Sequence, residues 1–197
     1  FYYVAHMFAY KNKYFLIIEN IKDIQLRNIK IRNKFIIIYR NNSKEEILAN
    51  LERFRKLCKT KGISLFIAND KNLAVKLNSD GIYLSAKNHD FKSLNIRNKN
   101  FHIIGSAHNF KEINLKKKQG CKYILLSRLF RVSYKPHMNF LGINKFNNYI
   151  AKIFKKIVPL GGINISNFKK LKLVRSDSFA IMTEVKKKPA KIINRLF

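Results

Sequence analysis

Eight short apolar runs recur along this 197-residue sequence, and each one changes abruptly to polar or glycine residues where it ends. A near-continuous apolar run bounded in this way is typical of a strand buried on both faces, as in a parallel sheet. Two neighbouring stretches show it most clearly, FHIIGSAHN at 101–109 and YILLSRLFRVSYK at 123–135. The predicted strands are Tyr14–Ile18, Phe35–Arg40, Ile63–Ala68, Gly81–Ser85, Phe101–Ala107, Tyr123–Ser127, Ile157–Leu160 and Ser178–Met182.

Helical signals follow most of these runs. Ser43 to Glu46 form a capping box, in which Ser43 accepts from the third helical amide while Glu46 reaches back. Asn109 with Glu112 repeats the cap signal further along the chain. A strand followed by a helix, eight times over, predicts a (β/α)8 TIM barrel in a single domain; the doubly wound open sheet is the competing architecture. Further helices are predicted at 73–77 and 143–154, after Ser166, and from Pro189.

Length and an apolar content of 47% favour one domain with a large core. We assign residues 14–197 to the barrel and residues 1–13 to an N-terminal extension. No apolar run approaches the roughly 18 residues of a membrane-spanning helix, and the start of the sequence lacks signal-peptide features, so we expect a cytoplasmic protein. In that compartment Cys58 and Cys121 are expected to be free, buried thiols.

The charge is strongly unbalanced, with 41 Lys and Arg against 11 Asp and Glu and a formal net charge of +30. Such a field predicts non-specific affinity for nucleic acids at low salt. A dedicated nucleic-acid face concentrates its charge in a patch or stripe, whereas the basic residues here are spread through nearly every predicted helix and loop. This distribution favours a solvated basic surface over a nucleic-acid-binding protein.

Candidate site residues lie at the carboxyl ends of the predicted strands, because the chemistry of a (β/α)8 barrel is carried by the loops at that face. A phosphorylated ligand suits these candidates, because they include cations, hydroxyls, one carboxylate and a Gly-Gly turn. Simpler structural roles compete, since Asp70 is also a good helix N-cap and Gly161-Gly162 a good tight turn. The candidates are Arg40, Asn69, Asp70, Asn88, Ser106, His108, Lys135, Gly161, Gly162 and Thr183.

An ordered set of motifs resembles one known family. The set comprises IAND, DGIYLS, IIGSAHN with Glu112, a strand whose following loop reaches Lys135, and PLGGI with Asn167. In this order it is similar to the thiamine phosphate synthase and TenI-like group, from about residue 35 to 184. The resemblance implies a transferase that couples a hydroxymethylpyrimidine diphosphate to a thiazole phosphate, with release of pyrophosphate and with Mg²⁺ as cofactor.

The resemblance also implies roles for individual residues. Arg40 and Asn69 would contact the diphosphate, and Asp70 and Asn88 would bind magnesium. Ser106 would hydrogen-bond phosphate oxygens and Lys135 would neutralise the leaving pyrophosphate. The thiazole phosphate would be held by the Gly-Gly turn of Gly161 and Gly162, through the Gly162 amide, and by Thr183.

The sequence departs from the family pattern at several of these places. Ile38 and Asn42 replace a Gln and a Lys, and Asn88 stands where the family has a second magnesium carboxylate. Arg128 and Arg131 enter the loop before Lys135, where the family has prolines, and add cations. Two alternatives therefore stay open: a TenI-like thiazole tautomerase with His108 as acid or base, and a non-catalytic thiazole- or phosphate-binding relative.

Overall fold

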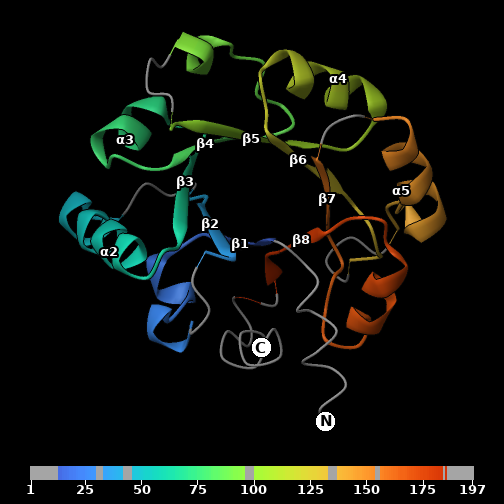
Figure 1. Ribbon diagram of the computed structural model, residues 1–197, viewed down its shortest axis with the longest axis horizontal. Helices are drawn as coiled ribbons and strands as arrows, with labels where there is room; N and C mark the ends of the chain where they lie inside the picture. The colour runs from blue at the N-terminus through green and yellow to red at the C-terminus, as the bar shows by residue number, and fades with distance from the viewer. Residues whose placement is uncertain are drawn as a thin grey trace.

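Eight parallel strands close into a barrel in the computed structural model, as the apolar runs predict (Figure 1). Each strand pairs with the next along the chain and β8 pairs with β1, so the open doubly wound sheet is excluded. The structure describes residues 13–29, 33–41, 46–95, 100–132, 137–153, 156–183 and 185. The strands are β1 (Lys13–Ile18), β2 (Phe35–Tyr39), β3 (Ser64–Ala68), β4 (Gly81–Leu84), β5 (His102–Ala107), β6 (Tyr123–Ser127), β7 (Lys156–Leu160) and β8 (Ser178–Ile181).

Helices ring the outside of the barrel (Figure 1). Asn109 caps α4 by accepting from the Glu112 amide at 2.9 Å, as predicted. The helix after β2 begins only at Leu48, after Ile47, which is later than the capping-box motif predicted. Ser43 itself, like Pro189 and residues 1–12, lies outside the described residues, so the N-terminal division stays a prediction. The helical elements are η1 (Ile21–Asp23), η2 (Leu26–Asn28), α2 (Leu48–Thr60), α3 (Lys71–Lys76), η3 (Lys92–Asn95), α4 (Phe110–Lys118), α5 (Gly142–Ala151) and η4 (Phe168–Leu173).

The buried residues form two hydrophobic cores, one inside the barrel and one between the barrel and its helices. Alternate residues such as Phe15 and Ile17 of β1 point inward and fill the barrel together with Phe66 and Tyr83. The residues between them, such as Leu16, pack outward against the helices. This period of two is the reason the strand sequences are apolar throughout, because both faces of the sheet are covered.

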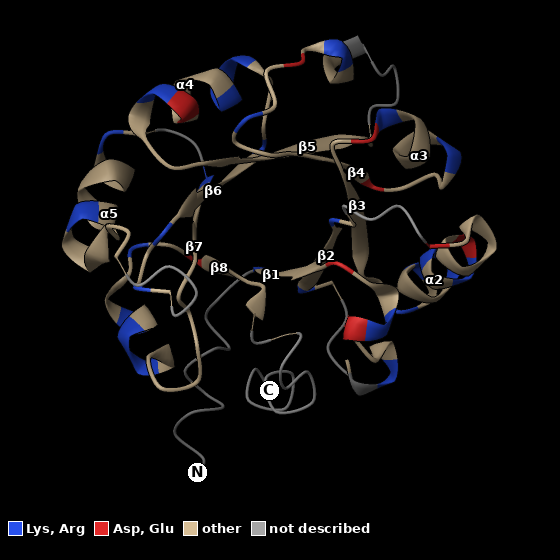
Figure 2. Ribbon diagram, turned by 180° about the vertical axis from the view of Figure 1, so that it is seen from behind, with Lys and Arg blue, Asp and Glu red and all other residues tan. Residues whose placement is uncertain are grey.

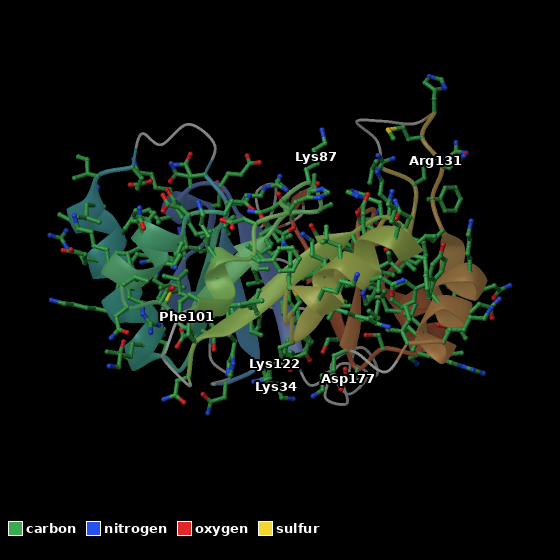
Figure 3. All side chains as sticks on the ribbon, turned by 90° about the horizontal axis from the view of Figure 1, so that it is seen from above. Lys34, Lys87, Phe101, Lys122, Arg131 and Asp177 are labelled. Carbon is green, nitrogen blue, oxygen red and sulfur yellow. The ribbon has the colours of Figure 1, made fainter. Side chains whose placement is uncertain are left out.

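The two ends of the barrel carry different residues (Figure 3). Lys34 and Lys122 directly precede β2 and β6, and they lie at one end. Lys87 and Arg131 follow β4 and β6, and they lie at the opposite end. The groups that follow the strands therefore share one rim, the carboxyl-end face at which a barrel of this kind builds its sites.

Lysine and arginine positions are distributed around the outer ring of helices rather than gathered on one of them (Figure 2). This distribution agrees with the solvated basic surface expected from the sequence. Cys58 and Cys121 are buried thiols that are not joined in a disulfide, as predicted. In the described part of the chain, no helix combines the length and apolar character needed to cross a membrane.

Candidate active site

A cavity of about 640 Å³ opens among the groups that follow the strands, so the barrel mouth is not closed by side chains. Its volume lies in the range of small-molecule sites. Ile17, Tyr83 and Ala180 reach it from the barrel interior, and the loops after β2, β4, β5, β6, β7 and β8 supply its walls. The polar and glycine residues that line it are Arg40, Tyr83, Ser85, Lys87, Ser106, His108, Ser127, Arg128, Arg131, Gly161, Gly162, Asn164 and Thr183.

The cavity floor is formed by the buried residues Tyr83 and Ser106, with the half-buried Arg40 beside them. Ser106 is 6% exposed, and both it and Arg40 lie near the hydroxyl of Tyr83, where they act to lower its pKa. Burial raises the pKa of Tyr83 while these two partners oppose the shift, so the phenol stays protonated at neutral pH. Ser106 therefore offers its hydroxyl at the buried base of the cavity.

Arg40 lies on the wall with an incompletely neutralised charge. One of its terminal nitrogens is 3.5 Å from the Glu19 carboxylate and 3.4 Å from the Met182 sulfur, a weak acceptor. Its Nε is buried and makes no hydrogen bond to the part of the chain that the structure describes. A buried, unsatisfied donor is costly, so this atom is expected to bind an anionic ligand.

The turn after β7 places two glycines in the left-handed region at the cavity edge, with φ of +91° at Gly161 and +69° at Gly162. Asn167 accepts from the Asn164 amide at 2.9 Å and donates to the Gly162 carbonyl at 2.7 Å, which holds the turn. A Cβ on Gly162 would come within 2.5 Å of the carbonyl oxygens of Phe130 and Arg131. The Gly162 amide donates to none of the described residues, which leaves it available to a ligand.

The loop after β6 packs on that turn and adds two arginines. Leu129 and Phe130 donate backbone hydrogen bonds to Leu160 and Gly161 at 2.8 and 3.0 Å, so the two loops form one unit. Within it, Nη1 of Arg128 is buried and without a hydrogen-bond partner among the described residues. Lys135, further along the same loop, lies outside the described residues, so its predicted role is neither supported nor opposed here.

The Glu112 carboxylate, one helical turn along, holds His108 at the mouth of the cavity through hydrogen bonds. Its Nδ1 lies 3.0 Å from Glu112 Oε2, which also accepts from the His108 amide at 2.8 Å. Burial raises the pKa of Glu112, but the bonds from His108 and Asn109 outweigh it and lower the pKa below the usual value of 4.5. The carboxylate therefore orients the imidazole and leaves Nε2 as the second ring nitrogen for proton transfer.

The three residues predicted for diphosphate and magnesium after β3 and β4 do not line the cavity. Asp70 caps α3, accepting from the Leu73 amide at 2.9 Å, so its structural interpretation is confirmed. Asn69 accepts from the Ser85 amide and from Nδ2 of Asn88, at 2.9 and 3.1 Å, and so links the two loops.

The same groups do not form a magnesium site. Mg²⁺ takes oxygen ligands in an octahedral shell, usually with one or two carboxylates. Here Oδ1 of Asn88 accepts from the Asp90 amide at 2.8 Å, and Oδ1 of Asp90 accepts from Lys92 at 2.8 Å, so these oxygens already serve the loop. Among described residues, no three His, Cys, Asp or Glu side chains converge. Asp70 and Asn88 as magnesium ligands stay a prediction that this donor set does not support.

The structure thus brings together Arg40, Ser106, His108, Gly161, Gly162 and Thr183 of the predicted residues. Sequence reasoning missed Tyr83, which looks like an ordinary inward-pointing strand residue, and Lys87, one lysine of a polar loop. It noted Arg128 and Arg131 only as departures from a family pattern. Their position directly after a buried strand was the available signal.

Fold and site together define a (β/α)8-barrel protein whose carboxyl-end cavity is cationic and suited to an anionic ligand. Comparison with known sequences makes this more specific. The sequence model described as thiamine monophosphate synthase, which covers the TenI group, matches residues 1–185. The chain belongs to this family, as the ordered motifs indicate.

Curated relatives agree with this assignment. A thiamine-phosphate synthase of Clostridioides difficile is 26% identical over 150 residues, which are 75% of this chain and 71% of the relative. One from Prochlorococcus marinus is 29% identical over 142 residues, 71% of this chain. That match spans only 41% of the Prochlorococcus relative.

Solved structures show the same fold. A thiamine phosphate pyrophosphorylase from Pyrococcus furiosus superposes with a TM-score of 0.70 at 17% identity, over 95% of this chain and 98% of the other. KGPDC from Streptococcus mutans gives a TM-score of 0.64 at 11% identity, over 94% and 95% of the two chains. At these identities the likeness establishes the barrel fold and leaves the reaction to be argued from the site.

Proposed function

We propose that this protein is a transferase of the thiamine-phosphate synthase type, which couples a hydroxymethylpyrimidine diphosphate to a thiazole phosphate. The observation that carries the proposal is the meeting of Arg40, Ser106 and Gly162 around one cavity, although they come from the ends of three different strands. Each is a donor to phosphoryl oxygens by its chemistry, and family membership supplies the reaction class.

The reaction breaks the bond between the pyrimidine methylene carbon and the diphosphate oxygen, and pyrophosphate leaves with the electron pair. The thiazole nitrogen then supplies its lone pair to the new carbon–nitrogen bond. Negative charge builds on the leaving group, so cations already placed in the cavity stabilise the transition state without reorganisation. Arg40 and Ser106 act on the diphosphate, and the Gly162 amide and Thr183 hold the thiazole phosphate. Lys135 keeps its predicted role beside the leaving pyrophosphate.

A coupling assay with both phosphorylated substrates tests this proposal by following thiamine phosphate formation. We expect product from the unaltered protein and a loss of about 10²-fold in kcat/KM for Arg40→Gln, the scale seen when one donor to a developing anion is removed. Lys122→Gln is the matched control, because Lys122 is a cation at the opposite end of the barrel (Figure 3). Absence of product, with thiazole phosphate still bound, would favour the non-catalytic relative.

One observation favours a second function, a TenI-like thiazole tautomerase. The Glu112 carboxylate orients the His108 imidazole at the cavity mouth, an arrangement suited to general acid–base catalysis. Interconversion of thiazole carboxylate isomers, followed by NMR, tests it. Under this alternative His108→Gln abolishes isomerisation and leaves coupling unchanged; loss of coupling in the same variant would instead place His108 in the transferase reaction.

A further inference from the structure

We propose that Arg128 and Arg131 form an oxyanion subsite that binds the diphosphate of the ligand without a divalent cation. The inference rests on the proposed function for its ligand class, a phosphorylated small molecule at this cavity. It goes beyond that function because it assigns the charge neutralisation to two residues of this chain, in place of the magnesium that the family implies.

Arg128 is built into the wall. Its Cα and Cβ lie 3.2 and 3.1 Å from the position that a Cβ on Gly161 would take, so its backbone packs directly against the glycine turn. Nη2 lies 3.0 Å from the sulfur of Met138, a weak acceptor that carries no charge, and Nη1 is buried without a hydrogen bond among the described residues. A guanidinium held this way keeps its full charge and at least one free donor for an anion.

Arg131 completes the pair at the rim. Its carbonyl oxygen is one of the two that face Gly162, and its guanidinium carbon lies 5.9 Å from the centre of the Phe140 ring. An aromatic face orients an arginine without neutralising it. Among the described residues, both arginines are therefore held by Met138 and Phe140, from the segment before α5, and neither is paired with a carboxylate.

The charge at the mouth matches a diphosphate. Arg40, Lys87, Arg128 and Arg131 line the cavity, and the described lining residues include no Asp or Glu. Lys87 and Arg131 stand on the loops after β4 and β6, at the same end of the barrel (Figure 3). Planar guanidinium groups grip phosphoryl oxygens in a bidentate manner, which supplies the neutralisation that a metal gives elsewhere. By contrast, Oδ1 of Asp70 and Oδ1 of Asn88, the predicted magnesium ligands, already accept hydrogen bonds from backbone amides.

The test is titration calorimetry of the full chain with pyrophosphate as the probe, once in EDTA and once in Mg²⁺. We expect one site per chain, with dissociation constants that agree within about threefold between the two buffers. Arg131→Gln and Arg128→Gln each weaken binding at least tenfold in EDTA, and Mg²⁺ does not restore it. Lys122→Gln, at the other end of the barrel, binds as the unaltered protein does. Arg131 is exposed, so its variant tests the subsite even where Arg128→Gln perturbs folding.

Binding that appears only with Mg²⁺ overturns the inference, as does unaltered affinity in Arg131→Gln. Several weak sites per chain that respond equally to Lys122→Gln also overturn it, because they show diffuse attraction to the basic surface. The proposed function fails separately. Coupling activity together with magnesium-dependent pyrophosphate binding removes this inference alone, whereas metal-independent binding without coupling removes the transferase proposal and leaves the subsite.

Discussion

Replacement of Gly162 by alanine gives the sharpest test of how the two loops at the cavity edge are packed. The added methyl would lie 2.5 Å from the carbonyl oxygens of Phe130 and Arg131 and 2.6 Å from the Phe130 carbonyl carbon. These are backbone atoms, so no rotamer change relieves the clash. The left-handed φ of +69° adds a further cost for a residue with a Cβ.

The magnitude follows from these two terms. A left-handed alanine costs about 1–2 kcal/mol, and forcing a methyl against packed atoms costs about 1–3 kcal/mol more. We therefore expect Gly162→Ala to lower the free energy of unfolding by about 2–5 kcal/mol. Displacement of the loop also moves the Gly162 amide, so affinity for thiazole phosphate should fall at least tenfold.

Gly142→Ala is the matched control. Gly142 has a similar φ of +71°, and a Cβ there meets nothing within 4 Å, so only the conformational term of about 1–2 kcal/mol applies. Urea unfolding followed by circular dichroism measures both variants, and calorimetry with thiazole phosphate measures binding. Equal destabilisation of the two variants, or unchanged affinity in Gly162→Ala, would refute the packing and the assigned amide.

Three further predictions concern stability. Asp80→Ala removes the carboxylate that accepts from both terminal nitrogens of Arg55, at 2.7 and 3.2 Å. Urea unfolding should show a free energy of unfolding lower by about 2–4 kcal/mol, and a decrease of under about 1 kcal/mol would contradict the importance of this ion pair. Burial lowers the pKa of Lys116, so the folded state holds fewer protons than the unfolded state just below pH 10.5. The free energy of unfolding, measured relative to that of Lys116→Met, should therefore rise with pH across that window. A difference between the two proteins that does not change with pH would contradict this prediction. The pKa of Glu112 lies below 4.5, so its contribution to stability is present above that pH and is lost as the pH falls through the lowered value. Glu112→Gln should lack this acid-dependent contribution when urea unfolding is measured between roughly pH 3 and pH 6, a range that spans the window.

Local patterns in the sequence determined where the strands and several helix ends lie. The apolar run of β6 and the seven other runs each became a strand within one residue of the predicted bounds, because a parallel strand covered on both faces needs apolar residues throughout. The caps at Asp70 and Asn109 were equally readable, since each depends on one side chain and an amide three residues away. The start of α2 could not be predicted in this way, because the helix begins at Leu48 and no side chain caps it.

Only the closed barrel decided which polar groups share the site. Arg40, Ser106 and Gly162 are far apart in sequence, and they meet because every strand points the same way around the ring. The same geometry turns Tyr83 inward to join the floor, and it links Asn69 to Asn88 outside the cavity. Strand pairing and loop packing join residues that are far apart in sequence, which no local pattern encodes. Residue types therefore predicted the chemistry of the site, whereas the tertiary structure decided which residues belong to it.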